Sequence, residues 1–248
     1  MKHALWRASI GIQEVSVAVL EGMVAVVTGT AQGIGRAIAD AVEEAGAVVH
    51  RVDRDQVDLA KSDEALPYLR GLGKVDILVH SAGGVCGQTH TPIDEVTDAA
   101  WDTVVDANLR TAFNAVRALA PGMKERGYGR ILTISSGAGR SVSLTGVQAY
   151  TSAKAGLIGF TRQMAWELGP HGITVNCIAP GFVLSNPTTQ KQWDSYGPDG
   201  QAALVSRIAT RRTGTADDIA RGALFFVDPG AGWVSGQTLS IDGGHSLF

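Results

Sequence analysis

Short apolar runs alternate with longer amphipathic segments along most of the chain. The runs are rich in β-branched residues and have the length of strands buried on both faces; they cover residues 24–28, 47–52, 75–79, 130–134, 174–179 and 238–241. Helical spacing marks the longer segments, at residues 35–45, 101–125, 149–168 and 216–226. Strands that alternate with helices predict a doubly wound α/β fold, a parallel sheet with helices on both faces. Ligands bind such sheets at the carboxyl ends of the strands.

One domain accounts for this pattern from residue 20 to residue 248. Residues 1–19 form an N-terminal extension to which the sequence assigns no role. Residues 184–212 are irregular and mix proline and glycine with polar and aromatic residues. A long irregular insert within a compact domain is more often a functional loop than a domain boundary, so we expect a substrate loop there.

Composition narrows the class of partner and the compartment. The net charge of −3 argues against a nucleic-acid or anionic-membrane partner. No segment reaches the roughly 18 apolar residues of a membrane span, and residues 1–19 lack the apolar core of a signal peptide. Cys86 and Cys177 have no metal-ligand spacing, so we expect free thiols, no metal site and a cytoplasmic protein.

A glycine-rich turn follows the first predicted strand and opens the first predicted helix. It reads Thr-Gly-Thr-Ala-Gln-Gly-Ile-Gly over residues 28–35. Glycines permit a tight turn and close approach of a pyrophosphate to the backbone, and the helix N-terminus offers free N–H groups. In this context the turn predicts a nucleotide-binding site.

A tyrosine and a lysine stand one helical turn apart at the start of the third predicted helix, at Tyr150 and Lys154. Tyrosine has an ordinary pKa near 10, and a nearby ammonium favours its phenolate. The pair alone occurs by chance in many helices. Here it follows the nucleotide-binding turn and a strand that ends in Ser135 and Ser136.

With these motifs the chain resembles the short-chain dehydrogenase/reductase family from about residue 20 to residue 244. The glycine turn spaced TGxxxGxG, the Tyr-x-x-x-Lys pair, the Asn-Cys-Ile-Ala-Pro-Gly segment at residues 176–181 and the Asp-Gly-Gly turn at 242–244 carry the resemblance. It implies a Rossmann-like sheet of about seven strands in a homotetramer or homodimer. It also implies an oxidoreductase that interconverts a secondary alcohol and a ketone.

The resemblance implies a catalytic tetrad of Asn108, Ser136, Tyr150 and Lys154. Tyr150 would accept the substrate proton, Ser136 would hold the substrate oxygen, and Lys154 would lower the pKa of Tyr150. Ser136 is one residue further from Tyr150 than is most common in the family, so Ser135 stays an alternative. Asn108 would support a water-linked proton path; standing alone, it would be interpreted as a helix residue bonded to local backbone.

The resemblance also implies a dinucleotide site along the carboxyl edge of the sheet. A carboxylate at Asp53 can bond the adenosine ribose and would repel a 2′-phosphate, which favours NAD over NADP. Arg51 and Arg54 argue for NADP. The expected contacts are Gly29, Gln32, Gly33, Ile34, Gly35, Asp53, Asp58, Leu59, Ser81, Ala82, Gly83, Tyr150, Lys154, Pro180, Gly181, Val183 and Ser185.

Two segments depart from the family pattern. Only four residues separate Asp53 from Asp58, so a helix is deleted there and the next strand is expected after a short turn. Ser81 replaces the usual asparagine, which puts a sheet-stabilising interaction in doubt.

The expected substrate contacts are Ser136, Gln148, Tyr150 and Trp193, and the loops around them are polar and aromatic. This lining favours a polyol, a sugar or another small hydroxylated substrate. Trp193 and Tyr196 could equally form a hydrophobic flap that anchors the loop. A lyase or epimerase on the same fold, or a non-catalytic NAD-binding protein, are the alternative functions.

Overall fold

Six strands form one parallel sheet in a computed structural model that describes residues 19–88, 90–143 and 145–246. Their order across the sheet is β2-β1-β3-β4-β5-β6. The strands are β1 (Val24–Thr28), β2 (Val48–Val52), β3 (Ile77–His80), β4 (Gly129–Ile134), β5 (Ile173–Pro180) and β6 (Thr238–Ile241). The predicted doubly wound α/β fold is confirmed. The predicted N-terminal extension, apart from Val19, lies outside the described residues.

The described sheet has six strands where about seven were expected, and the difference lies beyond β2. The strand expected at Asp58 and Leu59 does not form, because these residues lie in a non-regular segment between β2 and α3. A parallel strand needs a crossover of a dozen or more residues, and too few residues separate β2 from Asp58. The predicted absence of a helix in this gap is confirmed.

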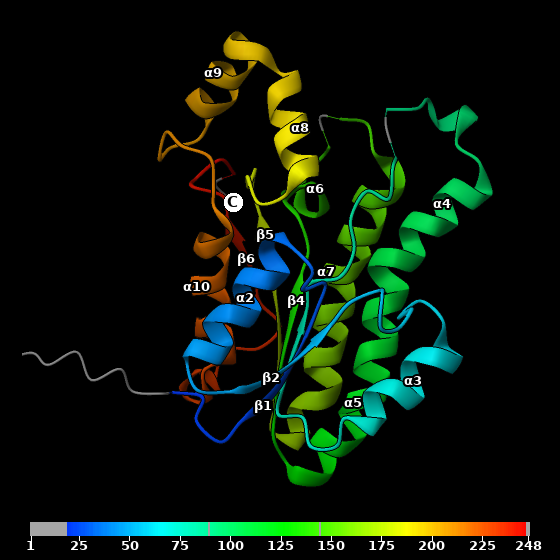
Figure 1. Cartoon of the computed structure of the whole chain (residues 1–248), viewed down its shortest axis with the longest axis vertical. Helices are drawn as coiled ribbons and strands as arrows, with labels where there is room; N and C mark the ends of the chain where they lie inside the picture. The colour runs from blue at the N-terminus through cyan, green and yellow to red at the C-terminus, as the bar shows by residue number, and fades with distance from the viewer. Residues whose placement is uncertain (1–18, 89, 144, 247–248) are drawn as a thin grey trace, which may run out of the picture.

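Helices cover both faces of the sheet (Figure 1). Helices α2 (Gly33–Glu44) and α10 (Ala216–Val227) pack on one face, where one buried cluster gathers residues such as Ile38, Ile178 and Phe226. Helices α3 (Ser62–Gly71), α5 (Thr111–Arg126) and α7 (Gln148–Leu168) build the second buried cluster on the other face. The continuous apolar runs of the central strands therefore face apolar side chains on both sides.

The predicted helix at 101–125 is divided in two by a wider turn. Helix α4 (Asp98–Val105) leads into a π-helical turn (Asp106–Arg110), after which α5 begins. Asn108 lies within this turn and is fully buried. Single π-helical turns inside α-helices are frequent at functional sites.

Two helices lie above the carboxyl ends of the strands, where an irregular substrate loop was expected (Figure 1). They are α8 (Pro187–Ser195) and α9 (Gly197–Arg207). The short helix α6 (Gly137–Arg140) lies at the same edge, directly after β4. No helix in the described part of the chain is long and apolar enough to cross a lipid bilayer.

Candidate active site

The glycine turn closes tightly against a neighbouring strand end. A Cβ at Gly29, where φ is +74°, would lie 2.8 Å from the backbone nitrogen of Ala82. A Cβ at Gly35 would lie 2.0 Å from the Gly29 oxygen. Gln32 begins α2 without a side-chain cap, which leaves the N–H groups of the first helical turn open to a ligand. This cradle fits the pyrophosphate of a dinucleotide.

The residues after β5 face the glycine turn from the other side. A Cβ at Gly33 would lie 3.2 Å from Ser185 Oγ. Val183 and Gly214 form an isolated parallel β-bridge. The two hydrogen bonds of the bridge are made by the residues on either side of Val183: Leu184 N donates to the Gly214 oxygen, and Gly214 N donates to the Phe182 oxygen. In an extended backbone, the N–H and C=O groups of successive residues point to opposite sides of the strand. The N–H and C=O of Val183 therefore face away from Gly214. Pro180 ends β5, and a Cβ at Gly181 would lie 2.6 Å from Asp242 Cβ.

Asp53 lies beside the glycine turn, at the end of β2. Its Oδ2 accepts a hydrogen bond from Ala31 N at 2.6 Å, and its Oδ1 accepts one from Arg54 N at 2.7 Å. Arg51 is directed to α2, where it bonds Asp40 and Glu43 at 2.7 Å each. Of the two arginines that argue for NADP, Arg51 is therefore held by carboxylates, and Arg54 stays exposed next to Asp53.

Asp58 and Leu59 are placed mainly by local bonds and by the core. Asp58 Oδ1 accepts a hydrogen bond from Ala60 N at 3.0 Å. Leu59 is buried, and its carbonyl accepts a hydrogen bond from Asn114 Nδ2 at 2.9 Å. This segment is thus fixed to α5 although it forms no strand.

Ser136 and Tyr150 meet at the carboxyl edge of the sheet. Ser136 caps α6 and accepts a hydrogen bond from Ala138 N at 3.2 Å. Burial of the Tyr150 hydroxyl raises its pKa. A hydrogen bond with Ser136 lowers the pKa and offsets part of this increase. The two hydroxyls can therefore hold one oxygen-bearing group between them.

Lys154 lies beneath this pair and is buried. Its Nζ donates a hydrogen bond to the Ile134 carbonyl at 2.8 Å and lies 5.6 Å from the centroid of the Tyr150 ring. Burial lowers the pKa of Lys154 to about 8. Lys154 was expected to lower the pKa of Tyr150. In this structure the pKa of Tyr150 is shifted by burial and by Ser136, and Lys154 does not contribute.

The alternative serine faces the other way. Ser135 is buried, and its Oγ donates a hydrogen bond to the Lys154 carbonyl at 2.8 Å. Its hydroxyl proton is thereby committed to the backbone of α7. The geometry favours Ser136 as the serine that faces Tyr150.

Asn108 uses its side chain to hold the segment after β3. Its Nδ2 donates to the Gly84 and Val104 carbonyls at 2.8 Å each, and its Oδ1 accepts from Gly84 N at 3.0 Å. A Cβ at Gly83 would lie 2.4 Å from Asn108 Oδ1. The side-chain amide of Asn108 is engaged by these backbone partners. If Asn108 takes part in a proton path, it would do so through its own backbone groups.

The segment from His80 to Gly83 is fastened to β1 by Thr28. Ser81 N and Ala82 N donate to Thr28 Oγ1 at 3.2 and 3.1 Å. The His80 ring bonds the same hydroxyl. A histidine thus supplies the link between strands that the change to Ser81 put in doubt, and its role could not be inferred from sequence.

The predicted substrate contacts lie in two different settings. Gln148 donates to the Thr91 carbonyl at 2.6 Å, and its Oε1 accepts from Gln88 Nε2 at 3.5 Å. Trp193 lies with its ring centroid 5.9 Å from that of Phe182, and Tyr196 lies at the same distance from Phe182. These three rings anchor α8 to the end of β5, which agrees with the flap alternative.

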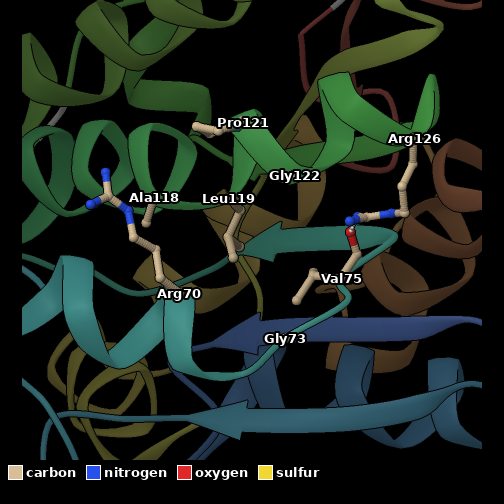
Figure 2. Close-up of a pocket in the computed structure, with 8 residues that line it drawn as sticks. All are labelled: Arg70, Gly73, Val75, Ala118, Leu119, Pro121, Gly122 and Arg126. Carbon is tan, nitrogen blue, oxygen red and sulfur yellow. Dashed lines mark hydrogen bonds between the residues drawn. The ribbon is translucent and has the colours of Figure 1, made fainter.

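A cavity of about 160 Å³ lies away from these residues (Figure 2). Arg70, Leu119 and Arg126 line it, between α3 and α5. Arg126 donates to the Val75 carbonyl and lies near Asp76, with 3.8 Å between Nε and Oδ1. The cavity belongs to the amino ends of the strands, opposite the candidate site.

The fold and the site define an α/β protein with a dinucleotide cradle beside a Ser–Tyr–Lys cluster. Residues 68–246 match the sequence model of a family described as enoyl-(acyl carrier protein) reductase. The chain belongs to the short-chain dehydrogenase/reductase family of oxidoreductases.

Three relatives illustrate its range. The subunit BbsD of (2S)-[(R)-hydroxy(phenyl)methyl]succinyl-CoA dehydrogenase from Thauera aromatica is 34% identical, over 92% of this chain and 98% of that one. A structure solved as a candidate NAD(P)-dependent gluconate 5-dehydrogenase from Beutenbergia cavernae, with bound NADP, is 32% identical with a TM-score of 0.82, over 92% of this chain and 98% of that one. A 3-oxoacyl-[acyl-carrier protein] reductase from Brucella melitensis, with bound NAD, is 28% identical with a TM-score of 0.83, over 96% and 99%.

Proposed function

We propose that the protein is a NAD-dependent dehydrogenase that interconverts a small secondary alcohol and its ketone. The observation that carries the proposal is the meeting of Ser136 and Tyr150 above Lys154, next to the glycine cradle. The Ser136 and Tyr150 hydroxyls can both reach one substrate oxygen, and the Lys154 ammonium lies beneath them. This arrangement suits proton exchange with an alcohol or a ketone.

The cofactor would lie along the carboxyl edge, with its pyrophosphate on the glycine turn and its adenosine ribose at Asp53. The backbone of Val183, the hydroxyl of Ser185 and the chain from Ser81 to Gly83 would hold its nicotinamide half. Pro180 and Gly181 would shape this end of the site. When bound, a nicotinamide supplies the hydride chemistry, and the protein supplies position and charge.

The protein's own residues would handle the proton. Ser136 would donate a hydrogen bond to the substrate oxygen, and Tyr150 would accept or return the proton of that oxygen. Because burial raises the pKa of Tyr150, its phenolate needs positive charge nearby. The Lys154 ammonium supports that need from below the ring, at 5.6 Å.

Asp53 supports NAD as the cofactor. Its carboxylate is fixed by two backbone N–H groups at the edge of the glycine turn, where it would bond ribose hydroxyls and repel a 2′-phosphate. One solved relative holds NAD and another holds NADP, so the proposal depends on this chain's own residues.

Uncharged polar and aromatic residues around the site favour a polyol, sugar or other hydroxylated small substrate. Gln88 and Gln148 lie close together, and the rings of Trp193 and Tyr196 pack around Phe182 where α8 meets the end of β5. A relative described as a gluconate 5-dehydrogenase agrees with this class. The acyl thioester named in other relatives is the competing substrate class.

Self-association would occur through α5 and α7. A cavity of about 330 Å³ between these helices is lined by Leu109, Phe113 and Phe160, and Phe113 is exposed. We expect a homotetramer or homodimer, measurable by light scattering.

The free thiols of Cys86 and Cys177 agree with a cytoplasmic location.

Absorbance of NADH during incubation with a panel of polyols, sugars and 3-hydroxyacyl thioesters tests the function. NADH formation with a hydroxylated small substrate, lost by at least about a thousandfold in Tyr150→Phe while NADH binding persists, is the expected result. Product formed without net NADH would instead indicate a lyase or epimerase. NADH binding with no product from any member of the panel would indicate a non-catalytic protein.

A further inference from the structure

The imidazole of His80 is fully buried at the end of β3, between β1 and α5. Its Nδ1 lies 3.1 Å from Thr28 Oγ1, and its Nε2 lies 3.2 Å from Thr111 Oγ1. Thr28 and His80 are also paired in register on adjacent strands. The ring therefore joins two hydroxyls from distant parts of the chain, and the proposed chemistry gives it no role.

The hydrogen bonds at Thr28 fix which ring nitrogen carries the proton. A hydroxyl oxygen offers two lone pairs and one hydrogen. Both lone pairs of Thr28 Oγ1 are used, because Ser81 N and Ala82 N donate to it. Its hydrogen is left for His80 Nδ1, so the ring must be neutral, with its proton on Nε2 and directed to Thr111.

Thr111 passes the connection to the π-helical turn. Its backbone N–H bonds the Asp106 carbonyl, whereas an α-helix would direct it to Ala107. The Thr111 hydroxyl donates to the Ala107 carbonyl instead, at 2.9 Å. The Thr111 hydroxyl thus donates to the Ala107 carbonyl in place of the Thr111 N–H, at the residue that precedes Asn108.

The other end of the chain of bonds reaches the cofactor cradle. Thr28 directly precedes Gly29, and a Cβ at Gly29 would lie 2.8 Å from Ala82 N, which Thr28 holds. Asn108 holds Gly84 through two hydrogen bonds. Thr28, His80 and Thr111 therefore connect the glycine turn, the segment after β3 and the Asn108 turn.

We propose that His80 is a positioning residue that sets the Asn108 turn relative to the glycine cradle through Thr28 and Thr111. The proposal rests on the function proposed above. It requires a neutral ring, and burial together with the nearby charge of Lys154 lowers the pKa of His80 to about 3. Breaking the link to Thr111 should therefore disturb turnover more than cofactor binding.

Two substitutions separate the two ends of the ring. His80→Asn keeps an acceptor near the Nδ1 position and loses the bond to Thr111, whereas His80→Gln keeps a donor near the Nε2 position. Thr111→Val removes the same bond from the other side. Thr103→Val is a matched control, because its exposed hydroxyl also bonds the carbonyl four residues back, at 2.7 Å, without a histidine.

The measurements are NADH affinity by fluorescence, kcat and the free energy of unfolding for each variant and for the double variant. We expect His80→Asn and Thr111→Val to lower kcat about tenfold each while NADH affinity stays within about threefold, with the double variant no worse than either one. His80→Gln should recover part of the loss, and Thr103→Val should match the wild type. Losses of kcat that multiply in the double variant, or unchanged kcat in both single variants, would overturn the proposal.

Nitrogen NMR of the full chain tests the same link without turnover. We expect the His80 signal, assigned by its loss in His80→Asn, to report a neutral ring with its proton on Nε2 at pH 6. A proton on Nδ1, or a charged ring at pH 6, overturns the inference whatever the activity. If the wild type shows this tautomer and non-additive unfolding free energies but turns over no alcohol, the function fails and the coupling stands.

Discussion

The carboxylate of Asp53 accepts a hydrogen bond from the backbone N–H of Ala31, with 2.6 Å between Oδ2 and N. This bond joins the end of β2 to the glycine turn and holds a negative charge at the edge of the cradle. A bound dinucleotide would meet that charge with its adenosine ribose. The same contact thus shapes the turn and discriminates between cofactors.

Cofactor preference should follow this charge. We expect the wild type to favour NAD over NADP in kcat/KM by at least about tenfold, or about 1.4 kcal/mol. Asp53→Asn keeps an acceptor for Ala31 and removes the charge, so the preference should shrink by about tenfold. Arg51→Gln is the control, because Arg51 is held by Asp40 and Glu43 and should leave the ratio unchanged. A wild type that strongly prefers NADP would contradict the assignment.

The two serines after β4 should have separable roles. Ser136→Ala removes the hydroxyl that faces Tyr150, so we expect kcat to fall by about a hundredfold. The same change removes the cap of α6, which should cost about 1 kcal/mol of stability. Ser135→Ala removes the bond to the Lys154 carbonyl and should cost about 1 kcal/mol of stability with a smaller effect on kcat. Parallel kinetics and thermal unfolding measure both. The reverse pattern would make Ser135 the serine that holds the substrate.

The sheet could be predicted because its central strands are buried on both faces. Continuous apolar runs appear in the sequence wherever such a strand forms, and each of the six predicted runs overlaps a strand. The helices that were missed lack an apolar stripe: α8 and α9 contain no buried residue among those described. A cap signal was present for α8, since Asn186 and Thr189 form a capping box before Pro187. Helix α3 contains Pro67 and has only two buried residues, Ala65 and Leu69.

The site was only partly accessible from sequence. Spacing places Tyr150 and Lys154 on one helix face, and the glycine turn follows directly from local geometry. Asn108 bonds Gly84 and His80 bonds Thr28, and these partners are distant in sequence, so no local pattern reveals them. The burial that raises the pKa of Tyr150 is likewise a property of the assembled fold.

The Lys154 ammonium should set the alkaline limit of ketone reduction. Its pKa is about 8, so the charge is present below pH 8 and is lost as pH rises through that value. Reduction needs a protonated Tyr150, whose pKa is raised, so Lys154 titrates first. We expect kcat/KM for NADH to fall as pH rises above about 8. Lys154→Arg stays charged and should move this fall to higher pH at reduced activity; an unchanged profile would contradict the role of the charge.

Arg130 fastens the end of the sheet opposite the site. The buried guanidinium donates to the Gly129 and Pro229 carbonyls at 3.0 Å each and to the Asp228 carbonyl at 3.4 Å. It also lies 4.5 Å from the centroid of the Tyr128 ring. One side chain at the start of β4 thus ties down the loop that follows α10.

Replacing Arg130 should therefore lower stability and leave catalysis intact. Arg130→Met keeps most of the volume but removes the donor from the buried Gly129 carbonyl and from the partly buried Asp228 and Pro229 carbonyls, at a cost of about 2–4 kcal/mol in the free energy of unfolding. Because Arg130 lies near the amino end of β4, kcat/KM measured well below the unfolding temperature should stay within about twofold. Arg70→Met, at an exposed position in α3, is the matched control and should unfold like the wild type. A stable but inactive Arg130→Met would show that this end of the sheet acts on the site.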